Sequence, residues 1–155
     1  MVYSFFDLFS WAFLNGYLLF EKGQAEPLHL NILYRQVCCS LIFAFYGSTE
    51  ELWFVNTDYG GAYWDTGNVV AQRSYENSPH KFVRNWNTPI LIITGESDYR
   101  IPYTQSLEAF TAARMLGVES RLISFENEAH QVFRPQNSIV WNREFFGWLD
   151  RYLKK

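Results

Sequence analysis

The second half of this 155-residue sequence predicts an α/β domain, in which helices cover a mostly parallel sheet. Two strand-like runs, residues 90–93 and 120–125, alternate with two helical patterns. The first run has no polar alternation, which is typical of a strand covered on both faces. Strand, helix, strand and helix in this order form the repeating unit of a parallel sheet.

Composition is that of a globular protein and excludes several classes of function. Apolar residues make up 48% of the chain and aromatic residues 19%, which suits a substantial hydrophobic core or an apolar interaction surface. The net charge is −3 and no block of Lys or Arg occurs, so nucleic-acid binding has no support. The adjacent Cys38 and Cys39 do not suit a disulfide, and the histidines lack metal-ligand spacing. We therefore expect no metal and no other cofactor.

The first 20 residues are apolar and aromatic, with Asp7 as their one charged residue. Asp7, Asn15 and Gly16 interrupt the run of about 20 apolar residues that a membrane span needs. A signal peptide is not indicated, because no basic leading region or small-residue cleavage site is clear. We expect a helical segment that is buried or covered by a partner. A membrane-associated segment is less favoured, and a stretch that is not native to the fold is a further alternative.

Between residues 24 and 68 the pattern predicts loops and one helix start. Residues 24–27 are polar and predict a loop, whereas residues 28–45 are apolar with a period that fits either a strand or a helix. Ser48 followed by Glu51 matches a capping box. Three glycines among turn-forming residues predict a loop over residues 58–68.

Two helices are predicted around the second strand. Residues 104–116 place Leu107, Phe110, Ala113 and Leu116 near one face, and Gly117 is suited to end this helix in the left-handed conformation. About residues 138–153 form a second amphipathic pattern, with a basic last turn that suits the helix dipole.

Asp98 and His130 are the candidate catalytic residues, because each follows one of the two predicted strands. Ligands of such sheets bind outside the carboxyl ends of the strands, and a right-handed crossover brings the two loops to one edge. A carboxylate beside an imidazole fixes its tautomer, so that the other ring nitrogen can act as a general base. Taken singly, each residue is more commonly a turn residue or a solvated one, so the hypothesis rests on their joint placement.

Four sequence motifs carry a resemblance to a known family: YGSTEELWF at residues 46–54, Ser78-Pro79, GESDYRIP at residues 95–102 and NEAH at residues 127–130. The segment from Tyr46 to the C-terminus resembles the C-terminal part of the α/β-hydrolase catalytic domain of the prolyl oligopeptidase family of serine peptidases. It looks most like the dipeptidyl-peptidase and acylaminoacyl-peptidase branches. The resemblance therefore implies a partial α/β-hydrolase fold.

The resemblance also implies roles for single residues. Asp98 and His130 would be members of a Ser-Asp-His triad, in the family's order along the chain. Arg100 would bind a backbone carbonyl of the substrate through its planar donors, although a surface Arg paired with a nearby Glu is an equal alternative. The aromatic residues from Trp53 to Trp64 resemble a segment beside the specificity pocket, but core packing is the slightly favoured interpretation.

The nucleophilic Ser of the family is the missing part, because no G-x-S-x-G occurs in these 155 residues. The spacing would place it near Phe13, and Ser10 nearby has no flanking glycines. We therefore divide the chain into residues 1–45, which are diverged or non-native, and residues 46–155, which match the peptidase domain.

The expected function is that of a serine-type, exopeptidase-like catalytic domain that acts on oligopeptides and contributes the Asp and His of the triad. The alternatives are a catalytically inactive binding or assembly module and an esterase-like hydrolase. The expected partner is a peptide substrate. Association into a homo-oligomer through an exposed sheet edge is also expected of a partial domain.

Overall fold

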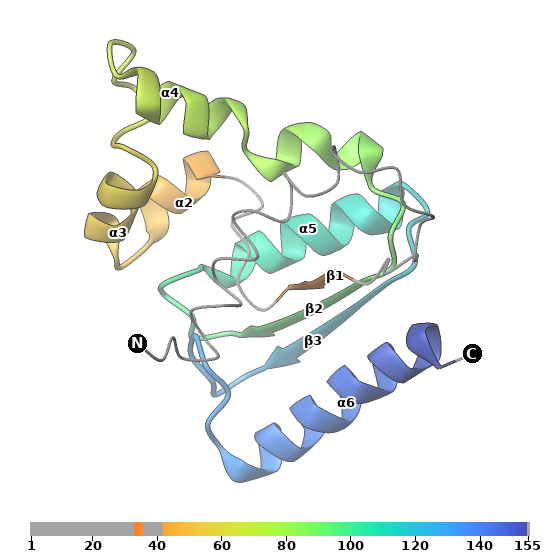
Figure 1. The fold of residues 1–155 in the computed structure, drawn as a ribbon. Helices are drawn as coiled ribbons and strands as arrows, with labels where there is room; N and C mark the ends of the chain where they lie inside the picture. Colours follow the sequence, from red (N-terminus) through yellow and green to blue (C-terminus); the bar gives the residue numbers. More distant parts are fainter. Residues whose placement is uncertain (1–32, 36–41, 155) are drawn as a thin grey trace, which may run out of the picture. The chain divides into compact units, whose positions relative to one another are not determined.

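The computed structural model describes residues 33–35 and 42–154, which form a three-stranded parallel sheet with helices on both faces (Figure 1). The strands are β1 (Leu33–Arg35), β2 (Ile90–Gly95) and β3 (Ser120–Phe125), in the order β1-β2-β3. Both pairs of neighbouring strands are parallel, and the register of β2 with β3 runs from Ile90 opposite Ser120 to Gly95 opposite Phe125. The predicted α/β class is confirmed.

Several predictions fall outside the described part of the chain. They are the helical or membrane-associated segment over the first 20 residues, the loop at residues 24–27 and the surroundings of the two cysteines. The ambiguous run over residues 28–45 contains both kinds of element, since β1 lies within it and α2 (Ile42–Ser48) begins within it. Among the helices that the structure describes, none has the length and apolar character needed to cross a membrane.

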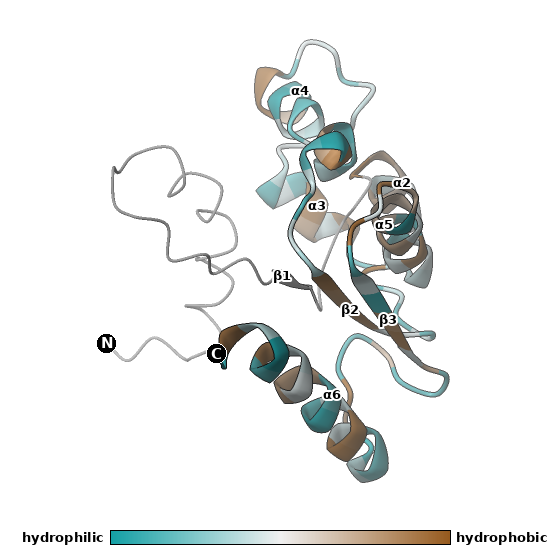
Figure 2. Cartoon of the chain, turned by 90° about the vertical axis from the view of Figure 1, so that its right-hand side faces the viewer, coloured by the Kyte–Doolittle hydropathy of each residue, from teal (hydrophilic) through white to brown (hydrophobic). Residues whose placement is uncertain are grey.

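Strand β2 is the centre of the core, and all six of its residues are buried. Ile90 and Ile92 pack with Ala109 and Ala113 of helix α5 (Tyr103–Met115). Leu91 and Ile93 point the other way, into a second cluster with Phe125 of β3 and Trp148 of helix α6 (Pro135–Leu153). Figure 2 shows β2 as apolar along its length, whereas α6 alternates between apolar and polar residues. The absence of polar alternation in β2 therefore reflects burial between two helices.

Helix α5 has the predicted position, and its predicted face is buried only in part: Ala113 is fully buried and Phe110 packs against the same core cluster. It runs from Tyr103 to Met115, and Gly117 follows with a φ of 73°, as expected for a helix-ending glycine. Leu107 and Leu116, however, are exposed. The buried residues of the helix are Gln105, Ala109 and Ala113. Because alanine lets a helix approach a sheet closely, Ala109 and Ala113 occupy the contact with β2.

Helix α6 begins at Pro135, three residues before the predicted start, and ends at Leu153 as predicted. Proline suits the first turn of a helix because its missing N–H needs no partner there. Trp148 is the buried residue of this helix. The partly buried apolar residues that pack around it include Val140, Trp141, Phe145 and Tyr152.

The chain between β1 and β2 forms short helices that support the site. They are α2 (Ile42–Ser48), α3 (Leu52–Asp58), α4 (Val69–Glu76) and the 3-10 helix η1 (Pro79–Asn85). Phe45 of α2 and Val55 of α3 are buried together with Ile101 from the loop after β2. The predicted loop follows α3 and ends at Asn68, whose side chain caps α4 by accepting a hydrogen bond from the Ala71 N–H at 3.1 Å.

The predicted capping box at Ser48 and Glu51 is wrong. Ser48 is the last residue of α2, and its hydroxyl donates to the carbonyl of Ala44. Glu51 precedes α3, but its side chain makes no capping hydrogen bond. Instead, the hydroxyl of Thr49 accepts a hydrogen bond from the Glu51 N–H at 3.0 Å. A Ser bonded back into its own helix is no longer available to begin the next one.

Candidate active site

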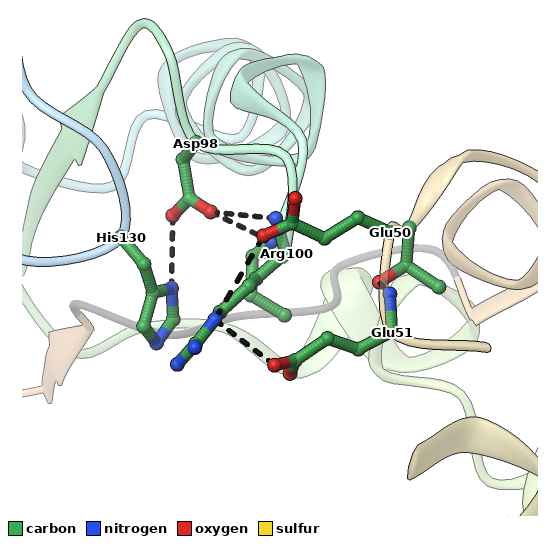
Figure 3. Close-up of polar contacts among 7 residues, drawn as sticks. Glu50, Glu51, Asp98, Arg100 and His130 are labelled. Carbon is green, nitrogen blue, oxygen red and sulfur yellow. Dashed lines mark hydrogen bonds and ion pairs between the residues drawn. The ribbon is translucent and has the colours of Figure 1, made fainter. Parts of the chain in front are cut away.

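Asp98 and His130 meet at the carboxyl edge of the sheet (Figure 3). Asp98 lies three residues after the end of β2, and His130 lies in the loop that follows β3. The Nδ1 atom of His130 is 3.0 Å from Oδ2 of Asp98. The predicted convergence of the two side chains is confirmed, and it arises from neighbouring parallel strands that end at the same level.

The Asp98 carboxylate is buried and held by its own loop. Its Oδ1 atom accepts hydrogen bonds from the backbone N–H groups of Arg100 and Ile101, at 3.0 and 2.9 Å. Oδ2 is thereby directed toward His130. The Ile101 side chain is itself buried against Phe45 of α2 and Val55 of α3, so these two helices support the loop. An acceptor fixed in this way holds a histidine in one orientation.

The contact with Asp98 determines which nitrogen of His130 is available for chemistry. An ionised carboxylate only accepts hydrogen bonds, so the neutral imidazole carries its proton on Nδ1. The Nε2 atom then keeps its lone pair and can take a proton from a hydroxyl. The His130 side chain is 21% exposed and that of Asp98 is 4% exposed. The imidazole is therefore partly accessible to solvent, while the carboxylate that it contacts is shielded.

Gly95 lets the two loops touch. A Cβ atom on Gly95 would lie 2.2 Å from the carbonyl oxygen of Ala129 and 2.3 Å from that of Glu128. The same loops are joined by hydrogen bonds from Ser97 N to Glu128 O and from Glu96 N to Phe125 O, each of 3.0 Å. Only glycine permits this approach of two backbones.

Sequence reasoning missed Gly95 and Glu128 as parts of the site. The sequence offers one local signal for each, since Gly95 ends the strand before Asp98 and Glu128 lies two residues before His130. Nothing in the pattern shows that the Glu128 side chain is 4% exposed.

Arg100 lies beside the pair but is engaged by two glutamates (Figure 3). Its Nε atom is 3.1 Å from Oε1 of Glu51 and 3.9 Å from Oε1 of Glu50. The backbone N–H of Glu50 also donates to the carbonyl of Tyr99 at 2.8 Å, which ties this segment to the Asp98 loop. The alternative interpretation, an arginine paired with a nearby glutamate, is therefore observed. Substrate binding by Arg100 stays a prediction.

The aromatic segment from Trp53 to Trp64 is only in part a piece of the core. Phe54 and Tyr59 pack against the buried cluster around Val55, so core packing is right for these two rings. Trp53 and Trp64 are 66% and 63% exposed, so core packing is wrong for the two tryptophans. Trp64 packs edge-on against Tyr63 and Tyr46, with ring centroids 4.8 and 5.2 Å apart. Its ring is thus ordered by its neighbours and still largely open to solvent.

The sequence also bears on a serine nucleophile and on a metal site. Ser10 and Phe13, near which the resemblance places a nucleophile, are outside the described residues. Within residues 33–35 and 42–154, no group of three or more His, Cys, Asp or Glu side chains is arranged to hold a metal ion.

The fold is that of part of an α/β-hydrolase domain, and comparison with solved structures agrees. Acylaminoacyl peptidase of Pyrococcus horikoshii, uncomplexed, superimposes with a TM-score of 0.62 and 25% identity, over 80% of this chain and 20% of that one. Its orthorhombic crystal form gives a TM-score of 0.64 and 26% identity, over the same shares of the two chains.

The family can also be stated. The model of the prolyl oligopeptidase family matches residues 33–155, so this chain belongs to that family of serine peptidases. Dipeptidyl-peptidase 5 of Porphyromonas gingivalis is 54% identical over 110 residues, which are 71% of this chain and 16% of that protein. Dipeptidyl-peptidase 5 of Aspergillus fumigatus is 36% identical over 105 residues, or 68% of this chain and 14% of that protein. The matching segment thus spans about one seventh to one sixth of the length of these curated relatives.

Proposed function

We propose that this chain supplies the acid–base part of a serine-type peptidase that acts on oligopeptides in the manner of a dipeptidyl-peptidase. One observation carries the proposal: the 3.0 Å contact between Asp98 and His130 at the edge of a hydrolase sheet. The 54% identity to dipeptidyl-peptidase 5 over 110 residues supports the class of substrate.

In the proposed reaction His130 takes up and gives back one proton in each of two half-reactions. Nε2 removes the proton from a serine hydroxyl while its oxygen bonds to the carbonyl carbon of the scissile peptide. The resulting imidazolium is stabilised by Asp98, which stays ionised. The C–N bond then breaks, and Nε2 returns the proton to the leaving amine. In the second half Nε2 takes a proton from water while the water oxygen bonds to the acyl carbon. The C–O bond to serine then breaks, Nε2 returns the proton to the serine oxygen, and the acid product leaves.

Arg100 is proposed to bind a carbonyl of the peptide. Both of its ion pairs use Nε, so these contacts do not engage the terminal nitrogens of the guanidinium. The side chain is 47% exposed, which leaves room for a substrate group. A planar guanidinium held at one nitrogen presents its remaining donors in a fixed direction.

The absence of G-x-S-x-G from the 155 residues favours a second candidate, in which the chain binds peptides without cleaving them. Without a serine on a strand-to-helix turn, the Asp–His pair has no hydroxyl to activate, and at best binding and weak electrostatic effects remain. We expect the chain alone to hydrolyse neither dipeptidyl arylamides nor esters, and a fluorophosphonate probe to leave it unlabelled. A serine labelled by the probe would contradict the missing nucleophile.

A chimera tests the acid–base role directly. The 110-residue matching segment of this chain replaces its counterpart in the P. gingivalis dipeptidyl-peptidase 5, and hydrolysis of a dipeptidyl arylamide is measured. We expect activity, and a loss of about 10⁴-fold in kcat for Asp98→Asn, which leaves the imidazole in the wrong tautomer. Asp150→Asn, an exposed change on α6, is the matched control. An active chimera whose kcat is the same with Asn at position 98 would refute the proposal.

A further inference from the structure

We propose that Glu128 is a positioning residue that holds the loop of His130, so that the imidazole keeps its Nδ1 atom on Asp98. The inference rests on the proposed function, because it assigns a role toward the same base. It concerns a carboxylate that takes no part in the proton transfer itself.

The Glu128 carboxylate ties its own loop to the start of helix α6. Oε2 accepts a hydrogen bond from the backbone N–H of Phe133 at 3.0 Å. Oε1 accepts hydrogen bonds from the backbone N–H of Arg134, at 3.0 Å, and from Nδ2 of Asn137, at 2.7 Å. Because Arg134 is the residue that precedes α6, His130 lies within a short loop that is closed on itself at residues 128 and 134.

The backbone of Glu128 makes the second connection, toward Asp98. Its carbonyl accepts a hydrogen bond from Ser97 N at 3.0 Å, and its N–H donates to the carbonyl of Phe125 at 3.2 Å. Ser97 is the residue before Asp98. One residue therefore links the end of β3, the loop that carries the orienting carboxylate and the first turn of α6. His130 is two residues away from this junction.

The chemistry of the site indicates that the carboxylate is ionised. Burial by itself raises the pKa of Glu128, but the hydrogen bonds from Asn137, Phe133 and Arg134 outweigh it, and the pKa lies below its usual range. A buried carboxylate is costly unless its oxygens are bonded, and here both oxygens accept from donors. With both oxygens engaged, Glu128 acts on the base only through the loop that it holds.

Glu128→Gln tests the hydrogen bonds of the carboxylate separately from the space that the side chain fills. Gln has nearly the same size, but one carboxylate oxygen becomes an NH₂ group that faces N–H donors. At least one of the three donors then loses its acceptor, and the closed loop opens. Glu126→Gln is the matched control, because Glu126 belongs to the same loop and its side chain is exposed.

The test uses the full chain with ¹⁵N-labelled histidine rings, observed by NMR at a pH where the imidazole is neutral. The signals of His130 are identified from their absence in His130→Ala. We expect the wild type and Glu126→Gln to show a protonated Nδ1 with a slowly exchanging proton. Glu128→Gln should lose that signal while circular dichroism and near-ultraviolet spectra stay those of a folded chain. Asn137→Ala, which keeps two of the three donors, should show a smaller loss.

The outcomes separate this inference from the proposed function. A folded Glu128→Gln chain with the wild-type His130 signal overturns the positioning role and leaves the Asp–His relay standing. If Glu128→Gln does not fold, Asn137→Ala decides, and an unchanged signal in that variant overturns the inference. A wild type without protonated Nδ1, or one whose signal survives Asp98→Asn, overturns the relay and the positioning role together.

Discussion

Gly95→Ala tests whether the close approach of the β2 end to the backbone of residues 128–129 keeps Asp98 in contact with His130. The added methyl group would lie 2.2 Å from the Ala129 carbonyl oxygen and 2.6 Å from the carbonyl carbon of Glu128. Ordinary contact begins at 3.4 Å, so the end of β2 and the loop after β3 must separate by about 1.2 Å, the difference between 3.4 and 2.2 Å. The obstacle is backbone on both sides, so no side-chain rotation relieves it.

Gly95→Ala is expected to lower both the free energy of unfolding and the kcat/KM of the chimera. Overpacking of this kind costs about 1–3 kcal/mol of unfolding free energy. A shift of about 1.2 Å between the two loops can lengthen the 3.0 Å contact between Asp98 and His130 by at most that amount, and the hydrogen bond is lost once the distance passes about 3.5 Å. In the chimera with dipeptidyl-peptidase 5 we expect kcat/KM to fall by about 100-fold, as a misplacement near 1 Å does in other enzymes.

Urea unfolding of the chain and arylamide hydrolysis by the chimera measure the two effects. Gly147→Ala is the control, because Gly147 lies inside α6 and a Cβ atom added there would meet nothing within 4 Å. We expect Gly147→Ala to stabilise the helix by about 1 kcal/mol without changing activity. A Gly95→Ala variant with the wild-type urea midpoint and with kcat/KM within about twofold of the parent chimera would refute the packing argument.

Three further predictions concern pH and substrate binding. The pKa of Glu128 is lowered on folding, so its contribution to the free energy of unfolding is fully present above its unfolded pKa of about 4.3. That contribution is lost as the pH falls through the lower folded pKa. Glu128→Gln should therefore make the urea midpoint depend less on pH in the acid range. Burial raises the pKa of Tyr75 to about 12, so its contribution is complete below about pH 10 and is lost as the pH rises toward 12. Tyr75→Phe should remove that alkaline loss and, because the hydrogen bond to the Gly61 carbonyl disappears, cost about 1 kcal/mol at pH 7. Arg100→Ala in the chimera should raise KM about tenfold and leave kcat within about twofold, and an unchanged KM would exclude Arg100 from substrate binding.

The sequence was sufficient for features that depend on local pattern and chain order. The apolar run from Ile90 predicted the central strand because it is buried on both faces. The positions of Asp98 and His130 after consecutive strands predicted their meeting, because parallel strands in one sheet share an edge. These predictions needed only periodicity and topology.

Features that depend on distant partners were not predictable in this way. Glu128 looks like a solvated loop residue until the N-terminal turn of α6 supplies its donors. The buried residues of α5 are Gln105, Ala109 and Ala113, of which the pattern predicted Ala113 alone; it selected Leu107 instead of the polar Gln105. The Ser48 motif fits the end of one helix as well as the start of another, and only the tertiary fold decides between them.

The last rung of the β2–β3 ladder pairs Gly95 with Phe125, and both site loops depart from it. The two loops are joined directly after they leave the sheet, because the Ser97 N–H donates a hydrogen bond to the Glu128 carbonyl. The backbone segments that carry the carboxylate and the imidazole are therefore hydrogen-bonded to each other at the end of the sheet. The backbone amide protons at the end of the β2–β3 pair should exchange with solvent only when the whole domain unfolds. Their exchange rate would therefore report the global stability of the domain.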